Sequence, residues 1–181
     1  MINVPFLKFQ NQRLPFISQA PIEHVVNIGI SDANRKGVNQ ILNALLADEY
    51  VLYTKTRNYH WNVTGMQFND LHKFFESQYE SLDVTIDEVA ERIRSLGGIS
   101  TATLVEFSKN SRLKEYPAKY PDAKIMLSNL LLDHETTIHN LRADLETCDK
   151  KHHDAGTADF LTGLMEQHEK MAWMLRSFLD K

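Results

Sequence analysis

A stretch of the sequence between residues 72 and 91 carries a histidine and several carboxylates at intervals that suit metal binding. At about 100° per residue, six of its side chains fall on one helix face: His72, Glu76, Glu80, Asp83, Asp87 and Glu91. Like charges four residues apart repel by roughly 0.2–0.5 kcal/mol, and a bound cation would turn that repulsion into attraction. Carboxylate oxygens with imidazole nitrogens suit iron, manganese or zinc better than a thiolate-preferring metal. The pattern indicates either such a site or an acidic face that is merely solvated, since charged residues are rarely buried.

The spacing of these residues prevents one chain from closing a metal site alone. The first pair, His72 and Glu76, lies about fifteen residues, roughly 22 Å along a helix axis, before the second pair, Asp87 and Glu91. Two copies of the helix packed antiparallel across a two-fold axis would join the pairs, because such an interface matches residue i with j and j with i. His60, at the end of the preceding helix, is placed to complete each site. We therefore expect two equivalent sites shared between two subunits.

Long amphipathic helices are expected to position these residues. Apolar residues recur at helical spacing in four long segments and one short one: 31–62, 69–96, 122–148, 157–179 and the short 104–109. Ser31 or Asp32 is the expected cap of the first helix, and Gly65 its expected stop. Four long helices without a strand pattern predict an all-α four-helix bundle. Residues 31–181 form this domain, and the proline-punctuated residues 1–30 are expected to form an extended arm.

Composition narrows the class of protein. The 181 residues are 43% hydrophobic and 24% charged, with only 7 glycines and 5 prolines, which suits one soluble helical domain. The net charge of −4 gives no general attraction for nucleic acid or anionic membranes. One cysteine, no signal-like apolar run in residues 1–20 and no eighteen-residue apolar stretch predict a cytoplasmic protein that does not cross a membrane.

The sequence resembles the Dps miniferritins, named for DNA-binding protein from starved cells. The resemblance rests on the elements "HWN", "LHKFFE", "DEVAERI" and "LGG" between residues 58 and 98, and on "TADFLTGLMEQHEKMAWML" at 157–175. It implies a ferritin-like four-helix bundle with a short extra helix between the second and third, assembled into a hollow dodecamer. It also implies a cytoplasmic ferroxidase that oxidises Fe(II), preferably with hydrogen peroxide, stores ferric mineral and protects against oxidative stress.

The resemblance assigns the candidate iron ligands residue by residue. His60 and His72 match the two histidines that one subunit supplies to a di-iron or mono-iron ferroxidase centre, and Asp87 and Glu91 match the partner's carboxylates. Glu76 stands where the family usually has aspartate, so the site departs by one methylene. Ordinary ferritins instead place Glu-x-x-His motifs in the bundle core. The chain contains no Glu-x-x-His, which favours the site between subunits.

Other residues have two interpretations each. Trp61, beside His60, is interpreted first as core packing; by resemblance it also suits the quenching of stray oxidising equivalents. Asp154 and Asp159 resemble the acidic lining of the family's three-fold iron-entry pores, although acids also favour helix N-termini as caps. The remaining histidines are interpreted as surface residues (His152, His153) or structural ones (His134, His139, His168).

DNA binding is predicted to be weak or absent. Family members that condense DNA use Lys/Arg-rich tails, because phosphate neutralisation requires those charges. Here Lys8 and Arg13 are balanced by Glu23 and Asp32 (+2 −2 = 0), and no basic tail follows the last helix. A DNA-binding nucleoid protector with little ferroxidase activity remains the alternative function.

Overall fold

The computed structural model describes residues 26–179, which fold into helices joined by turns, with no strand in that range. The helices are α1 (Asp32–Asn62), α2 (Phe68–Ser95), α3 (Leu104–Asn110), α4 (Ala123–Lys150) and α5 (Ala155–Leu179). The predicted all-α bundle and its short extra helix are confirmed, with boundaries within two residues of those expected. The predicted arm lies mostly outside the described residues. Within residues 26–179, no helix is long and apolar enough to cross a membrane.

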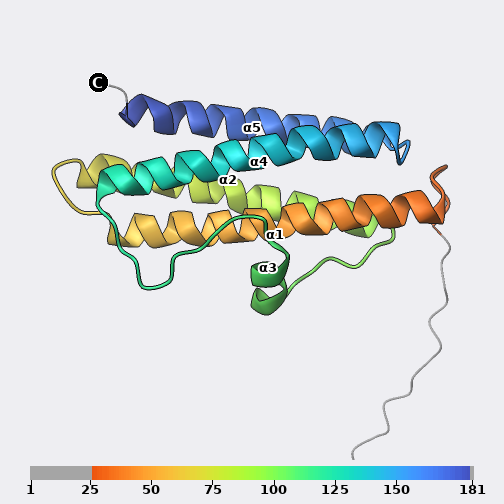
Figure 1. The fold of residues 1–181 in the computed structure, drawn as a ribbon, viewed down its shortest axis with the longest axis horizontal. Coiled ribbons are helices and arrows are strands. Elements are labelled where there is room, and N and C mark those ends of the chain that lie inside the picture. Colours follow the sequence, from red (N-terminus) through yellow and green to blue (C-terminus); the bar gives the residue numbers. More distant parts are fainter. Residues whose placement is uncertain (1–25, 180–181) are drawn as a thin grey trace, which may run out of the picture.

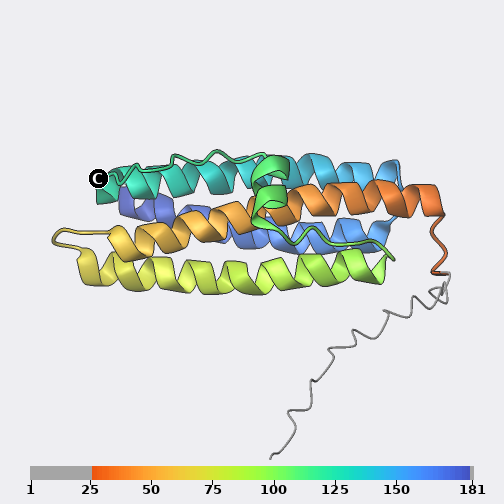
Figure 2. The same ribbon diagram turned by 90° about the horizontal axis from the view of Figure 1, so that it is seen from below.

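The four long helices run side by side as two hairpins, α1 with α2 and α4 with α5, and α3 lies outside them against α1 (Figure 1, Figure 2). A single long connection crosses from the end of α2 to the start of α4 and carries α3. One such crossover is the topology of ferritin-like bundles. This arrangement places the outer face of α2 away from both α4 and the crossover.

Local capping fixes where the helices begin. The Ser31 hydroxyl accepts from the backbone N–H of Asn34 at 3.3 Å, and the Asp122 carboxylate accepts from that of Ile125 at 2.9 Å. Thr103 opens α3 with a reciprocal capping box. The predicted stop at Gly65 is displaced: α1 ends at Asn62, and Gly65, with φ of 110°, serves the following turn.

The apolar residues that recur at helical spacing in α2 are buried along nearly its whole length. Six of its apolar residues are at most 1% exposed: Leu71, Phe75, Leu82, Val89, Ile93 and Leu96. Phe68 differs and is 46% exposed, because it is the first residue of α2, at the end of the bundle. Its ring instead stacks on His72, with centroids 5.1 Å apart.

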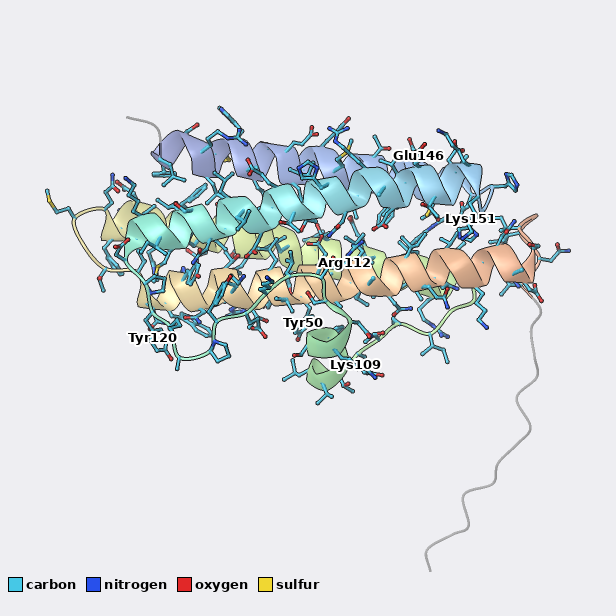
Figure 3. All side chains as sticks on the ribbon, in the orientation of Figure 1. Tyr50, Lys109, Arg112, Tyr120, Glu146 and Lys151 are labelled. Atoms are coloured by element: carbon cyan, nitrogen blue, oxygen red, sulfur yellow. The ribbon has the colours of Figure 1, made fainter. Side chains whose placement is uncertain are left out.

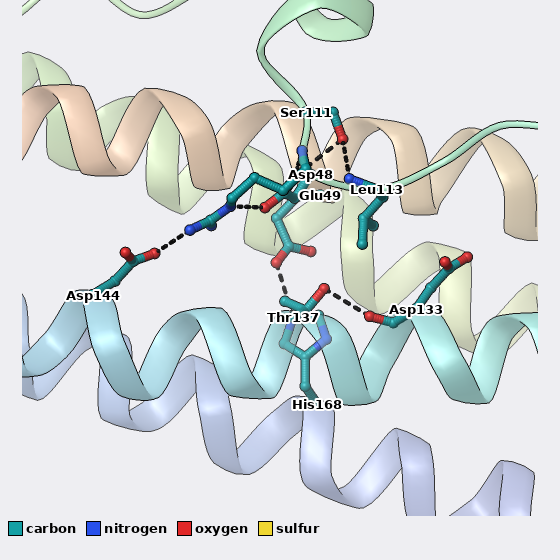
Figure 4. A network of polar contacts seen from close by, with 9 residues as sticks. Asp48, Glu49, Ser111, Leu113, Asp133, Thr137, Asp144 and His168 are labelled. Atoms are coloured by element: carbon teal, nitrogen blue, oxygen red, sulfur yellow. Dashed lines mark hydrogen bonds and ion pairs between the residues drawn. The ribbon is translucent and has the colours of Figure 1, made fainter.

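Two buried ion-pair groups fasten the crossover to the bundle. Asp48 of α1 is fully buried. Its carboxylate accepts from the backbone N–H and the guanidinium of Arg112 and from the hydroxyl of Ser111 (Figure 4). Arg112 also pairs with Asp144 of α4 at 2.8 Å. Further along, the Lys55 ammonium joins Asp133 at 2.5 Å and the carbonyl of Lys114 at 2.6 Å. The crossover is therefore held by groups from both hairpins.

Candidate metal centre

His60 and His72 lock each other in place where α1 and α2 meet. The Nδ1 of His60 lies 2.8 Å from the carbonyl of His72, and the Nδ1 of His72 lies 2.9 Å from the carbonyl of His60. Their rings stack with centroids 3.7 Å apart and planes 20° apart. A carbonyl only accepts, so each Nδ1 carries the proton and donates. In the neutral rings, each Nε2 therefore keeps a free lone pair, the state in which histidine binds a metal.

The turn between the helices creates this pairing. His60 is in the last turn of α1, and His72 is in the second turn of α2. Between them the N–H of Val63 donates to the carbonyl of Tyr59, and that of Phe68 donates to the carbonyl of Gly65. The short connection reverses the chain and sets the two rings face to face, with His60 only 7% exposed.

Glu76 extends this half of the site by one helical turn. It follows His72 at i+4 and is half-buried. The Tyr79 hydroxyl donates to its Oε1 at 3.3 Å, and the Tyr79 ring meets that of His60 edge-on at 5.2 Å. The Nε2 atoms of His60 and His72 and the carboxylate of Glu76 thus belong to the same end of the α1–α2 hairpin.

Asp87 and Glu91 lie on the same outer face of α2 but nearer its other end. Both are exposed, and within residues 26–179 neither carboxylate has a hydrogen-bond or ion-pair partner. No group of three or more His, Cys, Asp or Glu in the described part of the chain is arranged to hold a metal ion. The chain brings His60 and His72 together and leaves Asp87 and Glu91 apart from them. The imidazole nitrogens of the histidines and the oxygens of the two carboxylates together are donors that fit iron.

The packing interpretation of Trp61 is wrong for the chain by itself. Its side chain is 64% exposed, and the Arg57 guanidinium lies 5.3 Å from its ring centroid. The next residue on a helix turns by about 100°, so while His60 points into the α1–α2 junction, Trp61 points outward.

Asp154 caps α5 and is buried, whereas Asp159 is exposed. The Asp154 carboxylate accepts from the N–H of Thr157 at 2.9 Å and from its hydroxyl at 2.6 Å, and it pairs with Arg92 at 3.2 Å. Only 3% of Asp154 is exposed. The capping interpretation thus describes what Asp154 does in the chain, and the pore role expected for Asp159 stays a prediction.

His152 was expected at the surface, and that expectation is wrong. It is 8% exposed, and its ring sits so close to Gly37 of α1 that a Cβ there would lie 2.1 Å from its Cε1. Burial, and then the charge of Lys151, lowers the pKa of His152. The sequence signal was a glycine inside a helix, which often marks close packing.

Sequence reasoning also missed a polar chain in the bundle core. The Nε2 of His168 lies 2.9 Å from Oε1 of Glu49, and its Nδ1 lies 2.9 Å from Nδ1 of His134; all three residues are at most 1% exposed (Figure 4 shows the first contact). The expected structural role of His134 and His168 agrees with this burial, while His139 is exposed. No local spacing links these residues, because they come from three different helices.

Comparison with known proteins identifies the relatives of this chain. The ferritin-like domain family matches residues 39–181. A low temperature-induced protein of Nostoc sp. is 48% identical over 155 residues, which cover 86% of this chain and 87% of that protein. DNA protection during starvation protein 2 of Bacillus anthracis is 40% identical over 81% of this chain and 99% of its own length. The DPS protein of Vibrio cholerae, described as a ferritin-like diiron-carboxylate protein, superposes with a TM-score of 0.80 at 31% identity, covering 86% and 97% of the two chains.

Proposed function

The chain belongs to the Dps family of ferritin-like miniferritins, and from that premise we propose that it is an iron-oxidising and iron-storing ferroxidase. Its substrate is Fe(II), its preferred oxidant is hydrogen peroxide, and it retains ferric mineral inside a shell of identical subunits, a dodecamer. Removing both peroxide and ferrous iron protects the cell from oxidative stress.

The single observation that carries this proposal is the reciprocal His60–His72 pair. Both Nδ1 atoms are occupied by backbone carbonyls, so both Nε2 atoms are left to bind a cation. Glu76 follows His72 by one helical turn and offers an oxygen donor of the kind that suits iron.

A second copy of the chain supplies the other carboxylates in this proposal. With α2 of two subunits antiparallel about a dyad near residues 81–82, Asp87 and Glu91 of one subunit face His60 and His72 of the other. Val84 is 57% exposed and lies within three residues of the proposed dyad, so its side chain is available to be covered. The exposure of both carboxylates on one chain is what such a shared site requires.

The reaction needs this chain to hold Fe(II) and to stabilise the charge of the product. Two Fe(II) and one H₂O₂ with two protons give two Fe(III) and two H₂O, so peroxide takes two electrons and no hydroxyl radical is released. The carboxylates of Glu76, Asp87 and Glu91 favour Fe(III) as it forms, because hard anionic oxygens prefer the higher charge. The His60–His72 lock keeps the nitrogen donors oriented throughout.

Anaerobic loading with Fe(II) followed by peroxide tests the proposal through the rate of ferric absorbance. His60→Ala and Asp87→Ala each lower the initial rate by at least about tenfold, since even outer-shell changes at metal sites cost that much. Glu88→Ala is the matched control: it removes an exposed carboxylate of α2 that lies outside that face and leaves the rate unchanged. Unchanged rates in both ligand variants would refute the assignment.

DNA protection is the alternative function, because several relatives are named for it. The net charge of −4 opposes phosphate binding. We propose that DNA binding is weak at physiological salt, and tight binding in a gel-shift assay would overturn that view.

A further inference from the structure

Gln78 of α2 buries a side-chain carboxamide that has no partner in the bundle. The residue is only 3% exposed, and within residues 26–179 neither its Nε2 nor its Oε1 forms a hydrogen bond. It follows Phe75 by three positions and precedes Leu82 by four, and both of those side chains are fully buried. Among the described residues, Gln78 is the one side chain with two buried and unpaired polar atoms. Because such atoms are costly to leave unpaired, their presence calls for a binding partner.

The carboxamide borders a pocket of about 270 Å³ between α2 and α5. From α2 the lining takes Ser77, Gln78 and Ser81, and from α5 it takes Gln167, Lys170 and two methionines. Gln167 and Lys170 are exposed, so the pocket is reached from solvent on that side, while Gln78 forms its buried end. None of these residues belongs to the candidate metal centre.

The charge of the pocket favours an anion. Among the described residues that line it, Lys170 is the one charged side chain and none is a carboxylate. Lys170 also has no ion-pair partner within residues 26–179, although α5 forms such pairs through Glu169 and Arg176. Hard cations such as Mg²⁺ and Ca²⁺ bind at carboxylates, and a lysine repels them. In a chain with a net charge of −4, this pocket is a local positive site.

The polar atoms of the pocket require a ligand that both accepts and donates hydrogen bonds. The ammonium of Lys170 and the amide N–H groups of Gln78 are donors. Oε1 of Gln167 accepts from the Thr85 hydroxyl at 3.2 Å, which leaves the N–H groups of Gln167 as further donors. Oε1 of Gln78 is an acceptor, and so is the Ser77 hydroxyl, because that hydroxyl already donates to a backbone carbonyl at 2.8 Å. An anion without a proton would satisfy the donors and leave Oε1 of Gln78 unpaired.

We propose that this pocket binds a hydrogen phosphate group. Its ionised oxygens accept from Lys170 and from the N–H groups of Gln78 and Gln167, and its protonated oxygen donates to Oε1 of Gln78. Sulfate has the same tetrahedral shape but carries no proton at pH 7. A site that pairs a ligand hydroxyl rejects the analogue that lacks it, so phosphate is preferred to sulfate. This binding site is additional to the proposed ferroxidase function and does not depend on it.

Isothermal titration calorimetry at pH 7 tests the site on the full-length, assembled protein prepared without iron, so that ferric mineral does not bind the phosphate. We expect saturable binding of inorganic phosphate that is at least about tenfold tighter than that of sulfate. Lys170→Gln weakens phosphate binding by at least about tenfold, because it removes the cation of the pocket. Lys109→Gln is the control: Lys109 is an exposed lysine of α3, outside the pocket (Figure 3), and its replacement leaves the affinity unchanged.

Gln78→Leu gives the sharper readout. This variant removes an unpaired carboxamide from an apolar helix face, so the protein folds and its thermal stability without phosphate does not fall. Phosphate binding weakens, and the preference for phosphate over sulfate disappears, because the group that recognises the proton is gone. An affinity for phosphate and a preference over sulfate that both survive in Gln78→Leu would overturn the assignment.

A parallel titration with glycerol 2-phosphate distinguishes the two sources of a hydrogen phosphate group. Tighter binding of inorganic phosphate assigns the pocket to the free ion, and tighter binding of the ester assigns it to a phosphorylated small molecule. Either result supports the site. Absence of saturable binding of both compounds, or equal affinity of the unaltered protein for phosphate and sulfate, would overturn it.

Discussion

His60 and His72 each donate a hydrogen bond from Nδ1 to the backbone carbonyl of the other residue. Replacing one side chain leaves its carbonyl in place, so the other ring keeps its orientation and its free Nε2. Replacing a single histidine therefore removes one proposed ligand without releasing the second. Glu76, which we expected to depart from the family pattern by one methylene, also accepts a hydrogen bond from the Tyr79 hydroxyl.

The buried His134 makes stability depend on pH. Burial, and then the charge of His168, lowers its pKa well below the ordinary value, so it stays neutral in the folded chain. Unfolded histidine titrates near pH 6.5, and below that pH the unfolded state binds a proton that the native state does not. The free energy of unfolding then falls as pH drops, by up to about 1.4 kcal/mol per pH unit until the folded pKa is reached.

Urea unfolding between about pH 5 and 7.5 measures this effect. His134→Leu flattens the pH dependence, whatever it costs at neutral pH by leaving His168 Nδ1 without its partner. His139→Ala, which removes an exposed histidine from the same helix, retains the slope of the unaltered protein. Equal slopes in His134→Leu and the unaltered protein would show that His134 is not the group responsible.

At the scale of the elements, the crossover between α2 and α4 depends on Asp48. Asp48→Ala leaves the Arg112 guanidinium and backbone N–H and the Ser111 hydroxyl without their acceptor. We expect a loss of about 2 kcal/mol in the free energy of unfolding, since hydrogen bonds to a buried charge are costly to break. Amide hydrogen exchange is faster in residues 104–120, the segment that Asp48 fastens.

Arg142→Ala provides the comparison for that measurement. Its pair with Glu169 also joins two helices at 2.5 Å, but the two side chains are 57% and 42% exposed. Exposed pairs contribute about 0.2–1 kcal/mol, so this variant changes stability little. Similar losses in Asp48→Ala and Arg142→Ala would contradict the anchoring role of Asp48.

Helix positions could be predicted from the sequence because capping and periodicity are local. Ser31 and Asp122 act within three residues of themselves, and the expected boundaries were confirmed accordingly. The core chain from Glu49 to His168 joins residues 119 apart, and only the packing of three helices brings them together. The position of His152 under Gly37 has the same origin. A pattern along a single helix could not predict these contacts, because they join residues of different segments.

For the whole molecule, the decisive part of our proposal is that each candidate site needs two chains. His60 and His72 lie at one end of the α1–α2 hairpin, while Asp87 and Glu91 lie nearer the other end of α2, so in this proposal a chain carries halves of two different sites. If that is correct, damage confined to one half can be complemented by a subunit damaged only in the other half. A site contained within a single chain cannot be rescued in this way.

Co-expression of two inactive subunits tests this sharing. One carries His60→Ala and His72→Ala, and the other carries Asp87→Ala and Glu91→Ala. Each homo-assembly lacks every site, but a mixed dimer retains one site in which the intact histidines of one subunit meet the intact carboxylates of the other. With random pairing, half of the dimers are mixed, so about a quarter of the ferroxidase rate returns.

Co-expression of a His60→Ala subunit with a His72→Ala subunit restores nothing, because both variants damage the same half of the site. Equal activity in the two mixtures would show that the site is not shared between subunits.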